Sequence, residues 1–259
     1  DKKLTFIQSN GVRPDLDMYL RLDGIYFNSN FNCSVMNYNI KKSYKNAKGI
    51  IFQTEFNKNL IFNWFGPHDN YVVIPNGADT KLIQELQYST DFENKFKTFG
   101  KIWSCAADWH PYKRLEENIK YFLTFSQEQD ILLVAGKNPD YKTDHPRIKY
   151  LGNLSLSDLM TVYKISDYFI HLAYLDHCPN VVIDARAHGC KIICSSSGGT
   201  KEIAGLNCDI VIEDEWDYRF IEEKVPPKMN FSNIVKGQID SDLSMVKTAK
   251  KYHKFLKEN

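Results

Sequence analysis

Short apolar runs alternate with helix-period segments through the second half of the chain. Between the first two runs, Leu115, Ile119 and Phe122 recur at helical spacing and predict one apolar helix face. Between the third and fourth runs, Ser157 can cap a helix that contains Leu159. Such alternation is typical of a parallel sheet with helical crossovers. The runs that predict its strands cover residues 101–107, 131–136, 147–152, 168–174, 191–196 and 209–212.

The first half of the chain repeats this pattern less regularly. Thr54 can cap a helix over residues 55–65, which then stops at Gly66. The apolar runs that predict strands here cover residues 4–8, 19–27, 49–53 and 71–77.

The polar stretch 86–100 separates the two patterned halves. We therefore expect a compact α/β domain over residues 1–98 and a second parallel α/β domain over residues 99–240. The segment 241–259 reads as a basic helix with a few apolar contacts, and it is free to pack back on the first domain.

Charge and cysteine use narrow the class of protein. Lys and Arg total 33 and Asp and Glu total 32, so no net field favours nucleic acid as a partner. The chain has no apolar run of membrane-spanning length and no signal-peptide core, which predicts a soluble, cytoplasmic protein. Its six cysteines form no CxxC pair, so reduced thiols are expected. Peripheral membrane contact and homo- or hetero-oligomers stay open.

One stretch, 176–199, gathers candidate chemistry at the end of a predicted strand. Asp176 falls in the strand-to-helix loop, and Pro179 suits the first turn of the helix that follows. Asn180 and Asp184 are four residues apart and share one helix face. At the carboxyl edge of a parallel sheet, free helix N–H groups favour a phosphate and carboxylates can bind sugar hydroxyls. The stretch therefore predicts a site for a ligand that carries both groups.

The same stretch resembles the donor-site signature of the retaining glycosyltransferases of the family-4 type, the glycosyl transferases group 1. Asp176 and Asp184 stand at the two glutamate positions of that signature, and Gly198, Gly199 and Glu202 stand at its Gly-Gly-x-x-Glu turn. The resemblance extends over roughly residues 45–213 and is strongest in the second half.

Two further segments agree with the family in order and spacing. The run 108–119 looks like the family's Arg-x-x-Pro-x-Lys-Gly segment, with Lys113 at the diphosphate-binding lysine. The run 147–174 looks like the strand, glycine, helix and strand that precede the donor loop, and Gly152 marks the stretch that borders the nucleobase in relatives. The resemblance implies an α/β GT-B fold: two Rossmann-like domains with parallel sheets, of which the N-terminal one is unusually small here.

The resemblance also implies an activity: a sugar moves from a nucleoside diphosphate sugar, UDP- or GDP-linked, to a hydroxyl of a glycan, lipid-linked or protein acceptor, with retention of configuration. Lys113 would bind the diphosphate, helped by the N–H groups at Asn180 and Val181. Asp184 would hold the ribose hydroxyls, and Asp176 would position the donor sugar and favour its positive charge. A fixed cationic site of this kind replaces a metal, so no cofactor and no metal are expected.

Two residues of the first half have weaker signals. Some bacterial relatives carry an Arg-x-Asp-Gly like 21–24 beside the acceptor cleft, which implies that Asp23 orients or deprotonates the acceptor hydroxyl. A buried pair of Arg21 and Asp23 that fixes the strand is an equal alternative. Gly11 stands at the place of the family's first glycine-rich turn, where backbone approaches phosphates, although a plain turn explains it as well.

Three departures from the family motivate a second hypothesis. The two acids are Asp rather than Glu, Asp108 stands where relatives have a phosphate-binding arginine, and the first domain has about half the usual size. A catalytically silent nucleotide-sugar-binding or scaffold subunit of a glycosylation complex is therefore the alternative. The Asp-x-Asp matches at 15–17 and 240–242 do not follow a strand as metal-dependent transferases require.

Overall fold

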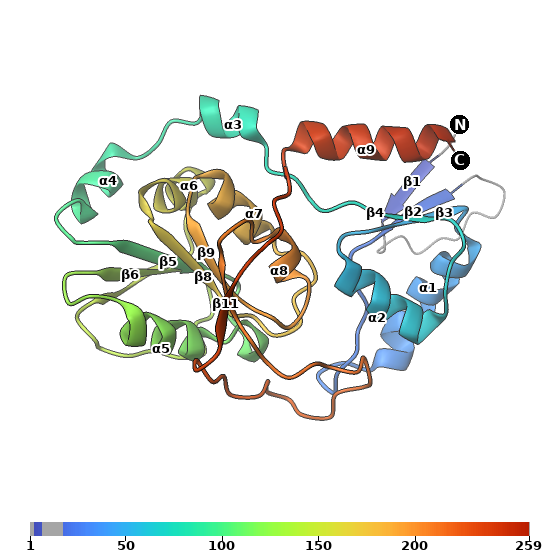
Figure 1. Cartoon of the computed structure of the whole chain (residues 1–259), viewed down its shortest axis with the longest axis horizontal. Helices are drawn as coiled ribbons and strands as arrows, with labels where there is room; N and C mark the ends of the chain where they lie inside the picture. Colours follow the sequence, from blue (N-terminus) through green and yellow to red (C-terminus); the bar gives the residue numbers. More distant parts are fainter. Residues whose placement is uncertain (1–2, 7–17, 259) are drawn as a thin grey trace.

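The computed structural model describes residues 3–6 and 18–258, and it contains two α/β units that each have their own sheet (Figure 1). The strands of the first sheet are all parallel and lie in the order β1-β2-β3-β4. They are β1 (Lys3–Phe6), β2 (Met18–Leu22), β3 (Gly49–Phe52) and β4 (Tyr71–Val73). The helices of this unit are α1 (Cys33–Asn46) and α2 (Glu55–Phe65).

The second sheet has the order β11-β10-β9-β8-β5-β6-β7, and all its neighbours are parallel except β10 and β11. Its strands are β5 (Ile102–Ala106), β6 (Ile131–Ala135), β7 (Ile148–Gly152), β8 (Tyr168–His171), β9 (Lys191–Ser195), β10 (Asp209–Val211) and β11 (Ile234–Lys236). The remaining helices are α3 (Thr80–Glu85), α4 (Thr90–Phe96), α5 (Leu115–Phe125), α6 (Leu156–Ile165), α7 (Asn180–Ala187), α8 (Thr200–Ile203) and α9 (Met245–Glu258). This arrangement is a GT-B fold with two Rossmann-like domains.

The first sheet is covered on both faces because its side chains alternate. Leu20, Ile50 and Phe52 pack in one cluster with the apolar residues of α1 and α2. Tyr19 and Ile51 point the other way and pack with Phe255 of α9. Figure 1 shows α9, the last helix of the chain, lying along the first sheet opposite α1 and α2.

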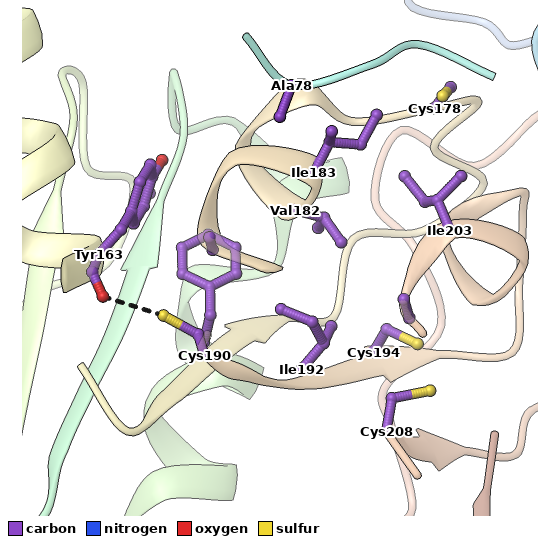
Figure 2. Close-up of a cluster of buried hydrophobic side chains, with 14 of the residues drawn as sticks. Ala78, Tyr163, Cys178, Val182, Ile183, Cys190, Ile192, Cys194, Ile203 and Cys208 are labelled. Carbon is purple, nitrogen blue, oxygen red and sulfur yellow. Dashed lines mark hydrogen bonds between the residues drawn. The ribbon is translucent and has the colours of Figure 1, made fainter. Parts of the chain in front are cut away.

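The second sheet is likewise covered on both faces. On one face, α5 packs against alternate residues of the central strands in a cluster that includes Leu132, Ile170 and Ile193. On the other face, α6, α7 and α8 enclose the cluster that Figure 2 shows, where the Cys190 thiol donates to the Tyr163 carbonyl at 3.1 Å. All six cysteines are free thiols, and all but Cys33 are buried.

Three segments join the two units. The chain passes from the first unit to the second through residues 74–101 and returns through 237–244. These two passages are hydrogen-bonded to each other at Ala78 and Ser244, where they form a parallel bridge. A third segment leaves the second sheet after β10 and reaches the first unit, where Ile221 bridges to Asn28 (Figure 1).

The predictions of strands and helix ends were confirmed where a clear apolar run or capping residue supported them. Each apolar run of the second half contains a strand, and Thr54 caps α2, which ends at Gly66 with a φ of 91°. Ser157 was the wrong cap for α6, because Ser155 accepts from the Asp158 N–H and the helix starts earlier. The run 19–27 was too long for a strand, since β2 ends at Leu22.

Candidate functional site

Lys113 reaches the site from the carboxyl end of β5. That strand is followed by a 3₁₀ turn (Pro111–Lys113), after which Arg114 adopts a left-handed φ of 52° and α5 begins. Lys113 Nζ lies 2.5 Å from Asp176 Oδ2. The two side chains are only 25% and 15% exposed, so this ion pair is largely shielded from water.

The Asp176 carboxylate has a second partner at the end of its own strand. Nε2 of the buried His171 ring lies 3.0 Å from the same Oδ2. Burial acts to raise the pKa of the Asp176 carboxyl, but the charge of Lys113 and the His171 hydrogen bond outweigh it and hold this pKa well below its usual range. Burial also lowers the pKa of His171, so a neutral ring donates to an ionised carboxylate.

Glu213, which follows β10, connects the loops around this pair. Its Oε1 lies 2.7 Å from Arg114 Nη2, and its Oε2 accepts hydrogen bonds from the Ser195 and Ser197 hydroxyls. The Leu175 N–H in turn donates to Ser197 Oγ at 3.4 Å. The Glu213 carboxylate therefore fixes Arg114, next to Lys113, and through Ser197 also Leu175, next to Asp176.

The Gly198-Gly199 turn packs directly on the loop that carries Asp176. Gly198 has a φ of 78°, and a Cβ there would lie 2.6 Å from the Asp176 carbonyl oxygen. A Cβ at Gly199 would lie 2.2 Å from the His177 carbonyl oxygen. Only glycine permits both the conformation and this close approach.

Glu202 carries the contact from this turn into the first unit. Its carboxylate accepts hydrogen bonds from the Glu55 and Phe56 N–H groups at 2.7 and 2.9 Å. Thr54 Oγ1 donates to the His177 carbonyl at 3.0 Å beside it. These N–H groups belong to the first two residues of α2, so Glu202 caps a helix of the other unit.

Asn180 and Asp184 share one face of α7, as their spacing predicts, and line a cavity of about 770 Å³. Apolar side chains of α6, including Met160, form another part of its wall. Among the described residues, none hydrogen-bonds the Asp184 carboxylate, and burial raises the pKa of Asp184 to about 6. A carboxylate that faces a cavity in this way is an available acceptor for hydroxyl groups.

A chain of polar side chains connects the first unit to the start of α7. Arg21 Nη1 lies 2.9 Å from Asp23 Oδ1, and Gln53 Nε2 donates to the same oxygen at 2.5 Å. Arg21 Nη2 donates to Asn76 Oδ1 at 2.5 Å, and Asn76 Nδ2 donates to Asn180 Oδ1 at 2.7 Å. The ion pair that we considered for Arg21 and Asp23 is thus present, although the Asp23 side chain is 42% exposed rather than buried.

Four of the predicted residues fall into two cavities, and Asp23 lines neither of them. Lys113 and Asp176 line a cavity of about 460 Å³ together with His110 and Lys224, whereas Arg21, Asn180 and Asp184 line the larger one. The loop 176–180 contributes to both. Val181 lies on α7 and is partly buried against the core, and Gly11 lies outside the described residues.

Two features bear on charge and metal binding. Asp108 is turned to Lys137 Nζ at 3.2 Å and to Asn138 Nδ2 at 2.9 Å, so its carboxylate has its own partners. Asp240 and Asp242 pair with Arg186 and Lys247, while residues 15–17 are not described. Within residues 3–6 and 18–258, we find no group of three or more His, Cys, Asp or Glu that could hold a metal ion.

Sequence reasoning did not identify His171, His177 and Glu213. The His177 ring fills the space beside Gly24, where a Cβ would lie 2.8 Å from its Nε2, and its Nδ1 lies 3.1 Å from Asn57 Nδ2. Burial lowers the pKa of His177 to about 4, so the ring is neutral. Its position next to Asp176 was the one signal that could have pointed to it.

The two α/β units, each with its own sheet and with polar groups gathered between them, define the GT-B class of fold. The chain matches the family described as Glycosyl transferases group 1 over residues 90–225. This match covers more than half of the chain, which therefore belongs to that family. A search of curated protein sequences found no match.

Solved structures show the same fold at low sequence identity. Sucrose-phosphate synthase from Thermosynechococcus elongatus has a TM-score of 0.61 at 15% identity, over 77% of this chain and 56% of that one. HepE from Anabaena, in complex with UDP-glucose, has a TM-score of 0.60 at 17% identity, over 78% and 60%. WaaG, a glycosyltransferase involved in lipopolysaccharide biosynthesis, has a TM-score of 0.60 at 13% identity, over 82% and 65%. This chain thus spans less than two thirds of the length of each.

Proposed function

We propose that the chain moves a sugar from a nucleoside diphosphate sugar, UDP- or GDP-linked, to an acceptor hydroxyl, with retention of configuration and without a metal. The observation that carries this proposal is the shielded pair of Lys113 and Asp176, held at 2.5 Å beside a cavity at the carboxyl edge of the second sheet. The resolved complex of HepE with UDP-glucose supports a nucleotide sugar as the donor.

The pair is suited to both charges that develop when the glycosidic bond breaks. Lys113 Nζ has three N–H donors, of which one is used by Asp176, so the others can bind oxygens of the leaving diphosphate. The fixed, ionised Asp176 carboxylate faces the positive charge that builds on the sugar. A fixed ammonium group can take the role of a divalent metal at this place, and Asp23 would orient or deprotonate the acceptor hydroxyl.

The donor would lie across the start of α7, with its ribose at Asp184 and its sugar at Asp176. In the structure, Asn76 and Thr54 hydrogen-bond Asn180 and the His177 carbonyl at this place, and so join the two units. The units therefore have to separate before a donor of this size can reach both cavities.

The second candidate is a catalytically silent nucleotide-sugar-binding subunit of a glycosylation complex. It is favoured by the fact that Asp176 already neutralises Lys113 and by the four strands that the described part of the first unit contains. The two candidates differ in turnover, because a silent subunit would bind nucleotide and leave the donor sugar intact with every acceptor.

Calorimetric titration with UDP, GDP, ADP and their common sugars tests the donor site, first with EDTA and then with Mn²⁺. We expect one nucleotide series to bind the wild type in EDTA, and Lys113→Ala and Asp184→Ala to weaken that binding. Unaltered donor binding in both variants would overturn the proposal. If a donor binds but is never hydrolysed or transferred, the silent-subunit candidate takes its place. Loss of binding in EDTA would reject the metal-independent part alone.

A further inference from the structure

The N-terminal half of α1 and the residues just before it expose an unusual number of apolar side chains. Val35 and Tyr38 are 65% and 67% exposed, and Phe31 and Met36 are 47% and 42% exposed. Clustered exposed apolar residues on a soluble domain mark an interaction site rather than random surface.

The C-terminal half of the same helix is basic. Lys42 and Lys45 follow Val35 and Tyr38 along the exposed side at steps of three and four residues, so all four point to the same side of the helix. Lys41 Nζ lies 5.5 Å from the centroid of the Phe65 ring at the edge of this side. We call this surface the α1 face; it consists of Phe31, Val35, Tyr38, Lys41, Lys42 and Lys45, whereas Met36 lies on the side of the buried Ile40.

A groove runs beside the α1 face, between α1 and the end of α2. It has a volume of about 630 Å³ and is lined by α1 residues, by Trp64 and Phe65 of α2 and by Phe220. Neither α1 nor the described residues that line the groove include an acidic residue. The combination of exposed aromatic rings and lysines matches the boundary between headgroups and acyl chains of an anionic bilayer.

We propose that the α1 face docks on an anionic lipid surface. Phe31, Val35 and Tyr38 enter the acyl boundary, and the lysines contact the headgroups. Phe31 and Asn30 also line the cavity of Lys113 and Asp176, so docking would place the lipid surface at the entrance of that cavity. The position of the lipid surface at this cavity would make a lipid-linked acceptor the natural substrate. That consequence rests on the proposed function, whereas docking itself does not depend on the proposed function.

The other basic helix, α9, provides the matched control. Its buried Phe255 packs against the first sheet, and it carries five lysines, two more than α1. Lys250 and Lys251 are exposed and lie on this helix. A purely nonspecific attraction of lysines to lipid would therefore depend on them too.

Vesicle co-sedimentation of the full chain tests docking, with phosphatidylcholine alone and with added phosphatidylglycerol. We expect wild type to bind only the anionic vesicles. Lys42→Gln/Lys45→Gln should bind about thirtyfold more weakly, since each lysine near such a surface contributes about 1 kcal/mol. Val35→Ser/Tyr38→Ser should bind at low salt and be lost at high salt, where wild type is partly retained, and Lys250→Gln/Lys251→Gln should bind like wild type.

Several outcomes would overturn the proposal: wild type that ignores anionic vesicles, α1 variants that bind as wild type does, or equal losses in the α9 control. Self-association of wild type without lipid, abolished in the α1 variants, would reassign this face to a second copy of the chain. Circular dichroism of each variant separates loss of docking from loss of fold. Donor titration, which does not involve α1, shows separately whether the proposed function holds.

Discussion

Lys113 and Asp176 meet at 2.5 Å although sixty-two residues separate them along the chain, and both stay largely buried. Each residue therefore depends on the other for its charge to be tolerated in the folded protein. Single and double variants of this pair can therefore separate its contribution to stability from its contribution to activity.

Removal of one partner should be more harmful to stability than removal of both. We expect Lys113→Ala to lower the free energy of unfolding by about 3 kcal/mol, because it leaves the Asp176 carboxylate buried without its cation. The double variant Lys113→Met/Asp176→Leu should recover much of that loss and still have no transferase activity. Urea unfolding and a donor-hydrolysis assay would check this, and equal stability of the single and double variants would argue against a coupled pair.

The Asp184 carboxyl predicts two opposite pH dependences. Its pKa is about 6 in the folded chain, above the ordinary 3.8, so the folded state binds more protons between these values and its stability falls as pH rises through 6. Nucleotide affinity should instead rise over the same range, since the ionised carboxylate is the better acceptor for ribose hydroxyls.

Asp184→Asn provides the comparison for both effects. Its melting temperature and nucleotide affinity should change less between pH 5 and pH 7 than those of wild type, measured by thermal shift and calorimetry. A wild-type affinity that is flat over that range would contradict a ribose-binding role for the ionised carboxylate.

Glu213 should act as a positioning residue. Glu213→Gln keeps an acceptor for the Ser195 and Ser197 hydroxyls but removes the charge opposite Arg114, whose side chain is only 2% exposed. We expect a loss of about 3 kcal/mol in stability and a larger loss in kcat than in KM. The Arg114→Met/Glu213→Gln pair tests the coupling, and additive effects of the two changes would show that the contact matters little.

Glu202 should hold the two units together. Glu202→Ala removes a cap from α2, a change of about 1 kcal/mol, and should increase the radius of gyration in small-angle scattering. Glu55→Ala is the control, because it removes a carboxylate of the same helix that pairs with Lys58 and caps no N–H group of the other unit. Unchanged scattering in Glu202→Ala would show that other contacts suffice.

Asp23 should separate acceptor chemistry from strand stability. We expect Asp23→Asn to lower kcat by about a hundredfold or more, with donor affinity unchanged, if this carboxylate deprotonates the acceptor hydroxyl. Steady-state kinetics and donor titration would distinguish this from a loss of folding, in which both quantities and the melting temperature would fall together.

The sequence predicted what depends on local patterns. The central strands β5 and β6 are fully buried, mostly apolar runs, and the Thr54 cap and the stop at Gly66 follow from neighbouring residues. The strand β11 was not predicted. The helix α1 was not predicted, because its buried side includes Asn37 and Ser43 and therefore lacks an apolar period.

The site was predictable only in part, because local sequence patterns do not show contacts between distant segments. The resemblance pointed to Lys113, Asp176 and Asp184, but the partners that fix them come from distant segments. Glu213 lies in an acidic stretch that resembles solvent-exposed surface, and its contact with Arg114 arises only when β10 pairs with β9. Pro179 also has no side-chain cap to offer α7, so the loop before it is held by tertiary contacts.

The return of the chain to its first sheet limits the way the two halves can move. The outgoing and returning passages are hydrogen-bonded side by side, with the Ala78 N–H donating to Leu243 and the Met245 N–H donating to Ala78. Because the two passages are hydrogen-bonded to each other, they allow the units to rotate about one axis and resist twisting and sliding of one unit against the other. A protease that cuts only one passage would therefore leave a nicked molecule in one piece, because the other passage and α9 still bind it together.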